Sequence, residues 1–239
     1  MPSAEATTHE IEEDLKAVYQ IYAGLAGGPD AESGLGGKLL FAGELDPTSA
    51  RLIRAANIAG AASLTATADA AQARQAMRDS ALDVVVNSLD EALRILKNGI
   101  RKRQPAAIGV TRAAEEIVRE MEERGVLPDL LPSPPPAGAA TLDYPVFLTQ
   151  GAQRVHEQPL AASLKFLVIA IPQDWAHRQA AFDALLLDSL SPDDHLNRRW
   201  LRLSPRYLGS QARRLRSLAC TEATASRLLD SIGKPIPDR

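Results

Sequence analysis

The chain has 239 residues, of which 45% are hydrophobic and 24% charged, as in a globular protein with a substantial core. Its formal net charge of −3 argues against a dedicated nucleic-acid binder, and its single cysteine, Cys220, excludes an intrachain disulfide and a multi-cysteine metal site. The acidic N-terminus is unlike a secretory signal, and the longest apolar run, Phe166 to Ile171, is too short for a bilayer span, so we expect a cytoplasmic protein with no membrane partner.

Residues 1–35 are predicted to form an acidic amphipathic helix, over about 9–25, and a loop. Residues 1–50 hold nine acidic side chains against two basic ones, Lys16 and Lys38. The run from Gly34 to Lys38 is similar to a phosphate-binding loop, but it precedes a strand, and Leu39 stands where a hydroxyl would hold Mg²⁺. We therefore interpret this run as an ordinary loop.

Residues 36–140 alternate short apolar runs with helical patterns, which is typical of βαβ units. The predicted strands are 39–42, 62–67, 84–86, 106–110 and 126–131. The predicted helices begin at Asp46-Pro47, Ala70, Ser88 and Thr111, and the last two end near Arg103 and Arg124. This order predicts an α/β protein with a Rossmann-like, doubly wound parallel sheet and additional N- and C-terminal helices.

Residues 141–239 are predicted to form a mainly helical region. The proline-rich run Pro132 to Ala140 marks its boundary, and Tyr144 to Leu148 is interpreted as a strand. Helices are expected from Pro159 onward, two of them beginning at Ser191-Pro192 and Ser204-Pro205 and the last ending at Gly233.

Histidine and cysteine give no sign of a metal site or nucleophile. The four histidines are scattered without metal-ligand spacing, and Cys220 has no histidine near it in sequence. We expect no metal.

An arginine-rich stretch near the C-terminus is a candidate partner surface. Its members are Arg198, Arg199, Arg202, Arg206, Arg213, Arg214 and Arg216, with Trp200 and Tyr207 among them. Phosphate pairing and stacking on these side chains would suit nucleic acid or an acidic partner. Docking of the basic helices against the acidic N-terminal helix, within one chain or across a homodimer, is the interpretation we favour over nucleic acid.

Five spaced strings between residues 36 and 131 resemble the NAD-binding core of urocanase (urocanate hydratase). They are Gly37-Lys-Leu-Leu-Phe41, Ile58-Ala-Gly60, Leu82-Asp83, Ser88-Leu-Asp-Glu-Ala-Leu93 and Arg124-Gly-Val-Leu-Pro-Asp129. The resemblance implies a Rossmann-like domain and, if it extends to function, NAD as cofactor and a lyase reaction.

The sequence departs from that family where the cofactor would bind. A glycine-rich run wraps the NAD pyrophosphate in the family, whereas this chain reads Glu44-Leu-Asp-Pro-Thr-Ser-Ala-Arg-Leu-Ile53. Pro47 offers no N–H to a phosphate, and a carboxylate about 4 Å from one would repel it by about 4 kcal/mol at an effective dielectric near 20. Thr67 replaces the acidic residue that would hold a ribose hydroxyl, and Arg112-Ala113 replaces a Gly-Asn pair. No counterpart of the family's active-site cysteine region is found, so we expect no NAD.

Three functional hypotheses follow. The first is a urocanase-like, non-catalytic binding or assembly module of unknown ligand. The second is a divergent enzyme that takes a small anionic molecule at the carboxyl ends of the strands, with Glu44 as general base. The candidate residues there are Gly43, Glu44, Thr67, Thr111 and Arg112. The third is binding of nucleic acid or an acidic partner by the arginine-rich helices.

Overall fold

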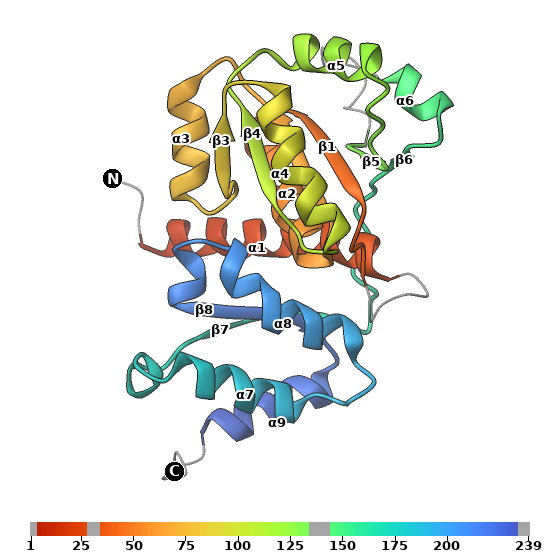
Figure 1. The fold of residues 1–239 in the computed structure, drawn as a ribbon. Helices are drawn as coiled ribbons and strands as arrows, with labels where there is room; N and C mark the ends of the chain where they lie inside the picture. The colour runs from red at the N-terminus through yellow and green to blue at the C-terminus, as the bar shows by residue number, and fades with distance from the viewer. Residues whose placement is uncertain (1–3, 28–33, 134–143, 234–239) are drawn as a thin grey trace.

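The protein is described from a computed structural model, which defines residues 4–27, 34–133 and 144–233, with side chains from residue 9 onward. The run Pro132 to Ala140 lies largely outside these residues. A parallel sheet with helices on both faces forms one part, a smaller α/β unit forms the other, and helix α1 (Ala4–Ala26) lies between them (Figure 1).

The parallel sheet has six strands in the order β3-β4-β2-β1-β5-β6. Their bounds are β1 Leu39–Glu44, β2 Ala62–Ala66, β3 Val84–Val86, β4 Ala107–Val110, β5 Leu130–Leu131 and β6 Gln153–Arg154. The first four agree with the sequence prediction to within two residues. The fifth strand is shorter than predicted, because Leu130 is its one residue that pairs with β1, opposite Leu40. Strand β6, which pairs with β5, was not predicted.

Helices cover both faces of this sheet, so the predicted doubly wound α/β fold is confirmed. Helices α2 (Pro47–Ala59) and α3 (Ala70–Arg78) cover one face; α4 (Leu89–Arg101), α5 (Ala114–Glu123) and α6 (Pro145–Thr149) cover the other. Successive strand residues point to opposite faces. Leu40 therefore packs with the α2 side of the core, whereas Leu39 and Phe41 pack with the α4 side.

The C-terminal unit contains two strands that were not predicted. β7 (Lys165–Ala170) and β8 (Leu215–Cys220) form an antiparallel pair. Around them lie α7 (Gln179–Ser189), α8 (His195–Tyr207), α9 (Glu222–Ile232) and the 3₁₀ turns Gln173–Trp175 and Gln211–Arg213. The expectation of helices throughout was wrong here. The apolar run Phe166 to Ile171 is short enough to form a strand, and this strand pairs with β8 far along the chain.

Two proline signals were also misread. Pro145 opens helix α6, so the strand predicted at 144–148 is a helical turn. Pro205 lies inside the last turns of α8, a helix that begins earlier because the Asp194 carboxylate accepts a hydrogen bond from the Asn197 N–H. Gly233 does end the last helix, as predicted.

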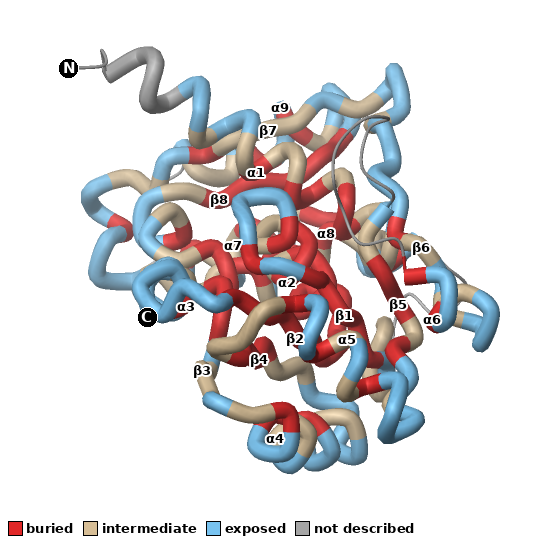
Figure 2. The backbone as a smooth tube through the Cα atoms, turned by 90° about the horizontal axis from the view of Figure 1, so that it is seen from above, coloured by how far each residue is buried: buried red, intermediate tan, exposed pale blue. Residues whose placement is uncertain are grey.

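One hydrophobic core joins α1 to the C-terminal unit. The Tyr19 ring lies 5.0 Å from that of Trp200, and the Tyr19 hydroxyl donates a 2.7 Å hydrogen bond to the Asn197 amide oxygen. The Tyr22 hydroxyl donates to the Leu196 carbonyl at 2.8 Å. Figure 2 shows this interior as a continuous buried region. The acidic helix therefore meets the basic helix α8 mainly through buried aromatic rings.

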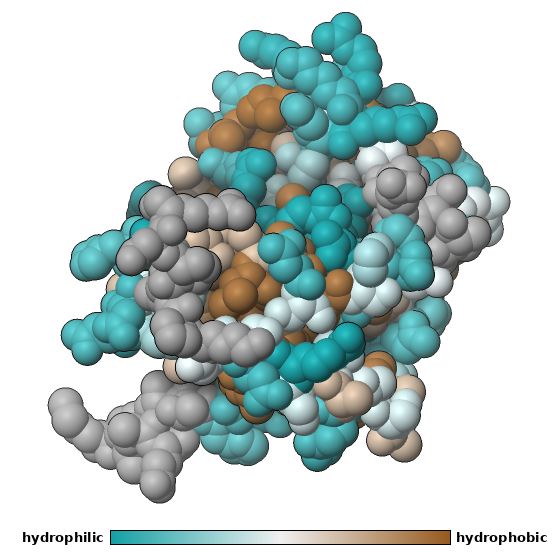
Figure 3. All heavy atoms as spheres, turned by 90° about the horizontal axis from the view of Figure 1, so that it is seen from below, coloured by the Kyte–Doolittle hydropathy of each residue, from teal (hydrophilic) through white to brown (hydrophobic). Residues whose placement is uncertain are grey.

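Hydrophobic side chains also reach the surface. Seen from below, the face that carries the C-terminal unit shows an apolar patch among hydrophilic side chains (Figure 3). Leu229 of α9 is 53% exposed. No helix in the described ranges is both long enough and apolar enough to cross a membrane.

Candidate functional site

The candidate residues of the crevice all lie at the carboxyl edge of the parallel sheet. Gly43 and Glu44 end β1, Thr67 follows β2, and Thr111 and Arg112 follow β4. The parallel pairing of β1 with β2 and of β2 with β4 brings these strand ends together. Open α/β sheets hold ligands at this edge.

Gly43 lies against a tyrosine rather than against open space. Its φ of +78° is one that L side chains rarely adopt, and its carbonyl accepts a 2.8 Å hydrogen bond from the Thr65 hydroxyl. The Tyr144 hydroxyl occupies the volume that a side chain at position 43 would need. Burial, reinforced by the nearby Glu115 and Glu44 carboxylates, raises the pKa of Tyr144 to about 12. The hydroxyl is therefore protonated at neutral pH.

The N-terminus of α2 is closed by its own first turn. The Asp46 carboxylate accepts a 2.6 Å hydrogen bond from the Ser49 N–H, and the Ser49 hydroxyl accepts one of 2.7 Å from the Asp46 N–H. Pro47 at the first helical position has no N–H. These are the groups that a phosphate at a helix N-terminus would use. The predicted Asp46 cap is confirmed, and it carries a negative charge where an anion would bind.

Glu44 occupies a second helix N-terminus. Ala113, the N-cap of α5, supplies no side-chain cap. The Glu44 carboxylate instead accepts a 3.3 Å hydrogen bond from the Ala114 N–H. This contact places the Glu44 carboxylate against the backbone of α5.

The hydroxyl groups of Thr67 and Thr111 are both engaged within the chain. Thr67 is 2% exposed and donates a 2.8 Å hydrogen bond to the Gln72 side chain. Thr111 donates one of 2.8 Å to the Asn87 side chain. Asp69 caps α3 by accepting from the Ala71 N–H at 2.7 Å.

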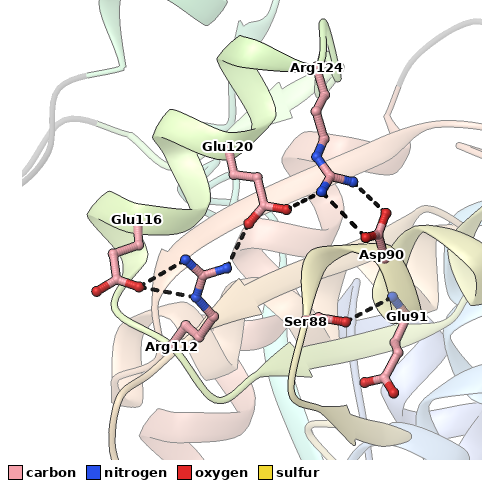
Figure 4. Close-up of polar contacts among 7 residues, drawn as sticks. All are labelled: Ser88, Asp90, Glu91, Arg112, Glu116, Glu120 and Arg124. Atoms are coloured by element: carbon pink, nitrogen blue, oxygen red, sulfur yellow. Dashed lines mark hydrogen bonds and ion pairs between the residues drawn. The ribbon is translucent and has the colours of Figure 1, made fainter.

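Arg112 is held by carboxylates of its own neighbourhood (Figure 4). It precedes α5, which begins three residues later than predicted, and its guanidinium pairs with Glu116 at 3.0 Å and with Glu120 at 2.6 Å. These two partners raise the pKa of Arg112. Glu120 also pairs with Arg124, which continues the network to Asp90 on α4. The one predicted cation of the crevice is thus neutralised by two acids.

Together these contacts close the helix N-termini that meet at the carboxyl edge. Asp46 caps α2, Asp69 caps α3, Ser88 caps α4 through the Glu91 N–H at 3.3 Å, and Glu44 caps α5. Three of the four caps are carboxylates. The arrangement disfavours an anionic ligand at this edge, both by charge and because at least one N–H donor of each helix N-terminus is already used.

The seven arginines of the predicted partner surface differ in exposure. Arg202, Arg206, Arg213 and Arg214 are exposed, Arg198 and Arg199 are half-buried, and Arg216 is buried. Arg216 pairs with Asp183 at 2.6 Å inside the C-terminal unit. The Arg199 side chain donates to the Ile58 carbonyl at 3.1 Å, near the end of α2. At least these two arginines therefore serve the internal structure.

At least one acidic side chain of α1, that of Asp14, contacts α2. Asp14 forms an ion pair with Arg51, with an N–O distance of 2.6 Å. Burial is the main influence on the neighbouring Arg54, whose pKa it lowers.

The remaining polar candidates do not assemble into a metal site. In the ranges that the structure describes, no three His, Cys, Asp or Glu side chains are grouped to hold a metal ion. Cys220 is 3% exposed, and burial raises the pKa of its thiol. A thiol that keeps its proton is a weak nucleophile.

Tyr144 is the residue of this edge that sequence reasoning missed. It stands 101 positions after Gly43, beyond the proline-rich run, and no local pattern connects the two. Its proximity to Gly43 depends on α6 packing against β1, where the Tyr144 and Phe41 rings lie 5.5 Å apart.

Residues of this chain match the model of a known protein family. The family model described as "Urocanase Rossmann-like domain" matches residues 6–155, which run from α1 to just beyond β6. Several residues of the five resembling strings hold this scaffold together. Lys38 pairs with Asp129 at 2.8 Å, the Asp83 carboxylate accepts from the Ala107 N–H at 2.8 Å, and Ser88 caps α4.

Proposed function

This chain belongs to the urocanase family through its Rossmann-like domain, and we propose that it is a member that does not hold NAD and acts as a non-catalytic binding or assembly module. The family relation supplies the expectation of NAD. The residues at the carboxyl edge supply the reason to depart from it.

The observation that carries the proposal is the closed N-terminus of α2. In a dinucleotide site, glycines let the backbone approach the pyrophosphate and direct N–H groups at it. Here Asp46 uses the Ser49 N–H, Pro47 provides none, and Tyr144 fills the space beside Gly43. The residues of this chain therefore do not fit the cofactor.

The enzyme hypothesis has less support at the same edge. It requires Glu44 to accept a proton and Arg112 to hold an anion. Glu44 accepts a hydrogen bond from the α5 backbone, and Arg112 pairs with Glu116 and Glu120. Each role would first require breaking a contact that stabilises the fold.

We expect no binding of NAD and no hydration of urocanate by the purified chain. NAD is titrated calorimetrically into the protein, and urocanate absorbance is followed with NAD added, with an NAD-dependent urocanase as positive control. The expected result is no binding heat and no loss of absorbance. Saturable NAD binding, or a loss of absorbance proportional to the concentration of this protein, would overturn the proposal.

A further inference from the structure

Strand β7 leaves one of its edges without a partner strand among the described residues. The N–H of Ile171 donates a 2.8 Å hydrogen bond to the Arg214 carbonyl. This bond shows which β7 residues direct their backbone N–H and C=O groups toward β8. Hydrogen-bonding direction alternates along a strand, so Phe166, Val168 and Ala170 direct their N–H and C=O groups away from β8. None of these outward groups makes a hydrogen bond to another described residue.

This edge is accessible and apolar. Four of the six β7 residues are half-buried or more, yet only Ile169 is fully buried, whereas β8 is buried over five of six. Figure 2 shows β7 nearer the outside of the molecule than the buried β8. Natural proteins protect such edges with proline, a bulge or an inward charge. Between Phe166 and Ala170 this strand has none of these.

Two depressions are lined by residues of both β7 and α1. One, of about 670 Å³, is lined by Phe166, Val168 and the α1 residues Glu12 and Lys16. The other, of about 590 Å³, is lined by Val168, Glu12, Arg213 and Arg214. Lys16 pairs with Glu13, but Glu12 and the two arginines form no ion pair with described residues. The two depressions share Glu12 and Val168 and are together called the groove; apolar side chains of β7 and uncompensated charges of both signs line it.

We propose that β7 pairs antiparallel with β7 of a second copy of this chain, about a twofold axis at Val168, to form a continuous four-stranded sheet. In this register Val168 lies opposite Val168 of the second copy, and Phe166 lies opposite Ala170. Each opposed pair exchanges two hydrogen bonds, so all the outward N–H and C=O groups are used. The inference deepens the proposed assembly role and rests on it for function, but its geometry involves no residue of the carboxyl edge.

The β7 edge is complementary to itself, which favours a second copy of this chain as its partner. A twofold contact requires a surface that complements itself. The bulky Phe166 faces the small Ala170, and Lys165 lies outside the opposed pairs, where it pairs with Glu222. Antiparallel pairing also reverses the groove end for end. The depression of one copy that is lined by Glu12, Arg213 and Arg214 then meets the depression of the other copy that is lined by Glu12, Glu13 and Lys16, so that a net positive end faces a net negative end.

The test compares a charge at the twofold axis with the same charge elsewhere. Sedimentation equilibrium is measured for the full chain, for Val168→Lys and for the matched control Val146→Lys, whose valine is 36% exposed on α6. Two lysines directly opposite each other repel, so we expect dimers for wild type and V146K, and for V168K a dimer dissociation constant at least about tenfold higher. Circular dichroism checks that each variant is folded.

Cross-linking tests the register and remains informative if V168K does not fold. Val168→Cys is treated with a short bis-maleimide, and Val146→Cys is the control. We expect a covalent dimer of V168C only. A monomeric wild type at its highest soluble concentration, a V168K that stays dimeric, or a V168C that fails to cross-link would each overturn the inference. NAD titration does not report on β7, so failure here and failure of the cofactor proposal are distinguishable.

Discussion

At the scale of single residues, the positive φ of Gly43 goes together with the close approach of a side chain, that of Tyr144. Glycine at this place permits a positive φ and a close approach of other atoms. The approaching group in this chain is the hydroxyl of Tyr144, held by ring contacts with Phe41 and Phe147. A glycine at position 43 therefore leaves room for a side chain of the protein itself.

Replacement of Gly43 by alanine tests this contact. We expect Gly43→Ala to lower the free energy of unfolding by about 2–4 kcal/mol, from a strained φ together with overpacking against Tyr144. Gly125→Ala is the matched control, because Gly125 also has a positive φ, +63°, but nothing within 4 Å of a new Cβ. It should cost about 1 kcal/mol. Urea unfolding measures both, and equal losses would show that Tyr144 does not limit the space.

Sequence reasoning identified the crevice residues but not their partners. Asp46 and Pro47 were predictable as a cap and a first helical residue because both signals are local. The pairing of Arg112 with Glu120 depends on where α5 begins, and the contact of Tyr144 with Gly43 depends on packing across the sheet. Such contacts between distant parts of the chain leave no local pattern.

At the scale of elements, those with local sequence signals were again predictable, and those that depend on distant contacts were not. Strands β1 to β4 were predictable because apolar runs alternate with capped helices, a pattern that itself implies a parallel sheet. Strands β7 and β8 were missed, since each lies among helices and becomes a strand only by pairing with the other across more than forty residues. Pro205 was misread as a helix start because the Asp194 cap earlier in the chain begins the helix instead.

Removal of the Asp46 cap tests the closed N-terminus of α2. We expect Asp46→Ala to lower the free energy of unfolding by about 0.5–2 kcal/mol, because the Ser49 N–H loses its acceptor. Asp46→Asn keeps an acceptor oxygen and should stay close to wild type. Chemical denaturation of the three proteins measures the difference. A D46A protein as stable as wild type would show that the carboxylate does not close this helix.

At the scale of the whole molecule, the segments predicted as 1–35, 36–140 and 141–239 share one core. Tyr19 and Tyr22 of α1 contact Trp200 of α8, while Leu15 on the same helix is buried in the same cluster as Ile53 of α2. The contact between the acidic and basic ends of the chain was foreseen from charge. Its buried aromatic content was not, because the charged residues mask the apolar face of each helix.

Truncation of an α1 aromatic should therefore affect stability far more than loss of an α1 charge. Tyr22 is 0% exposed, so Tyr22→Ala should lower the free energy of unfolding by about 3–5 kcal/mol. Glu13→Ala removes an exposed ion pair with Lys16 and should change it by less than about 0.5 kcal/mol. Unfolding followed by tryptophan fluorescence at low and high salt measures both. A larger loss for E13A than for Y22A, or a Y22A effect abolished by salt, would show that charge, and not aromatic packing, dominates the contribution of α1 to stability.

The central claim, that this urocanase-family domain does not hold NAD, is tested most directly on freshly purified protein. The protein is denatured, and the small molecules released are identified and quantified by mass spectrometry. We predict no NAD in the supernatant, because Asp46 caps α2, Pro47 offers no N–H to a phosphate, and the Tyr144 hydroxyl fills the space beside Gly43. Release of NAD in an amount equal to that of the protein would contradict the account and return the carboxyl edge to the role of a cofactor site.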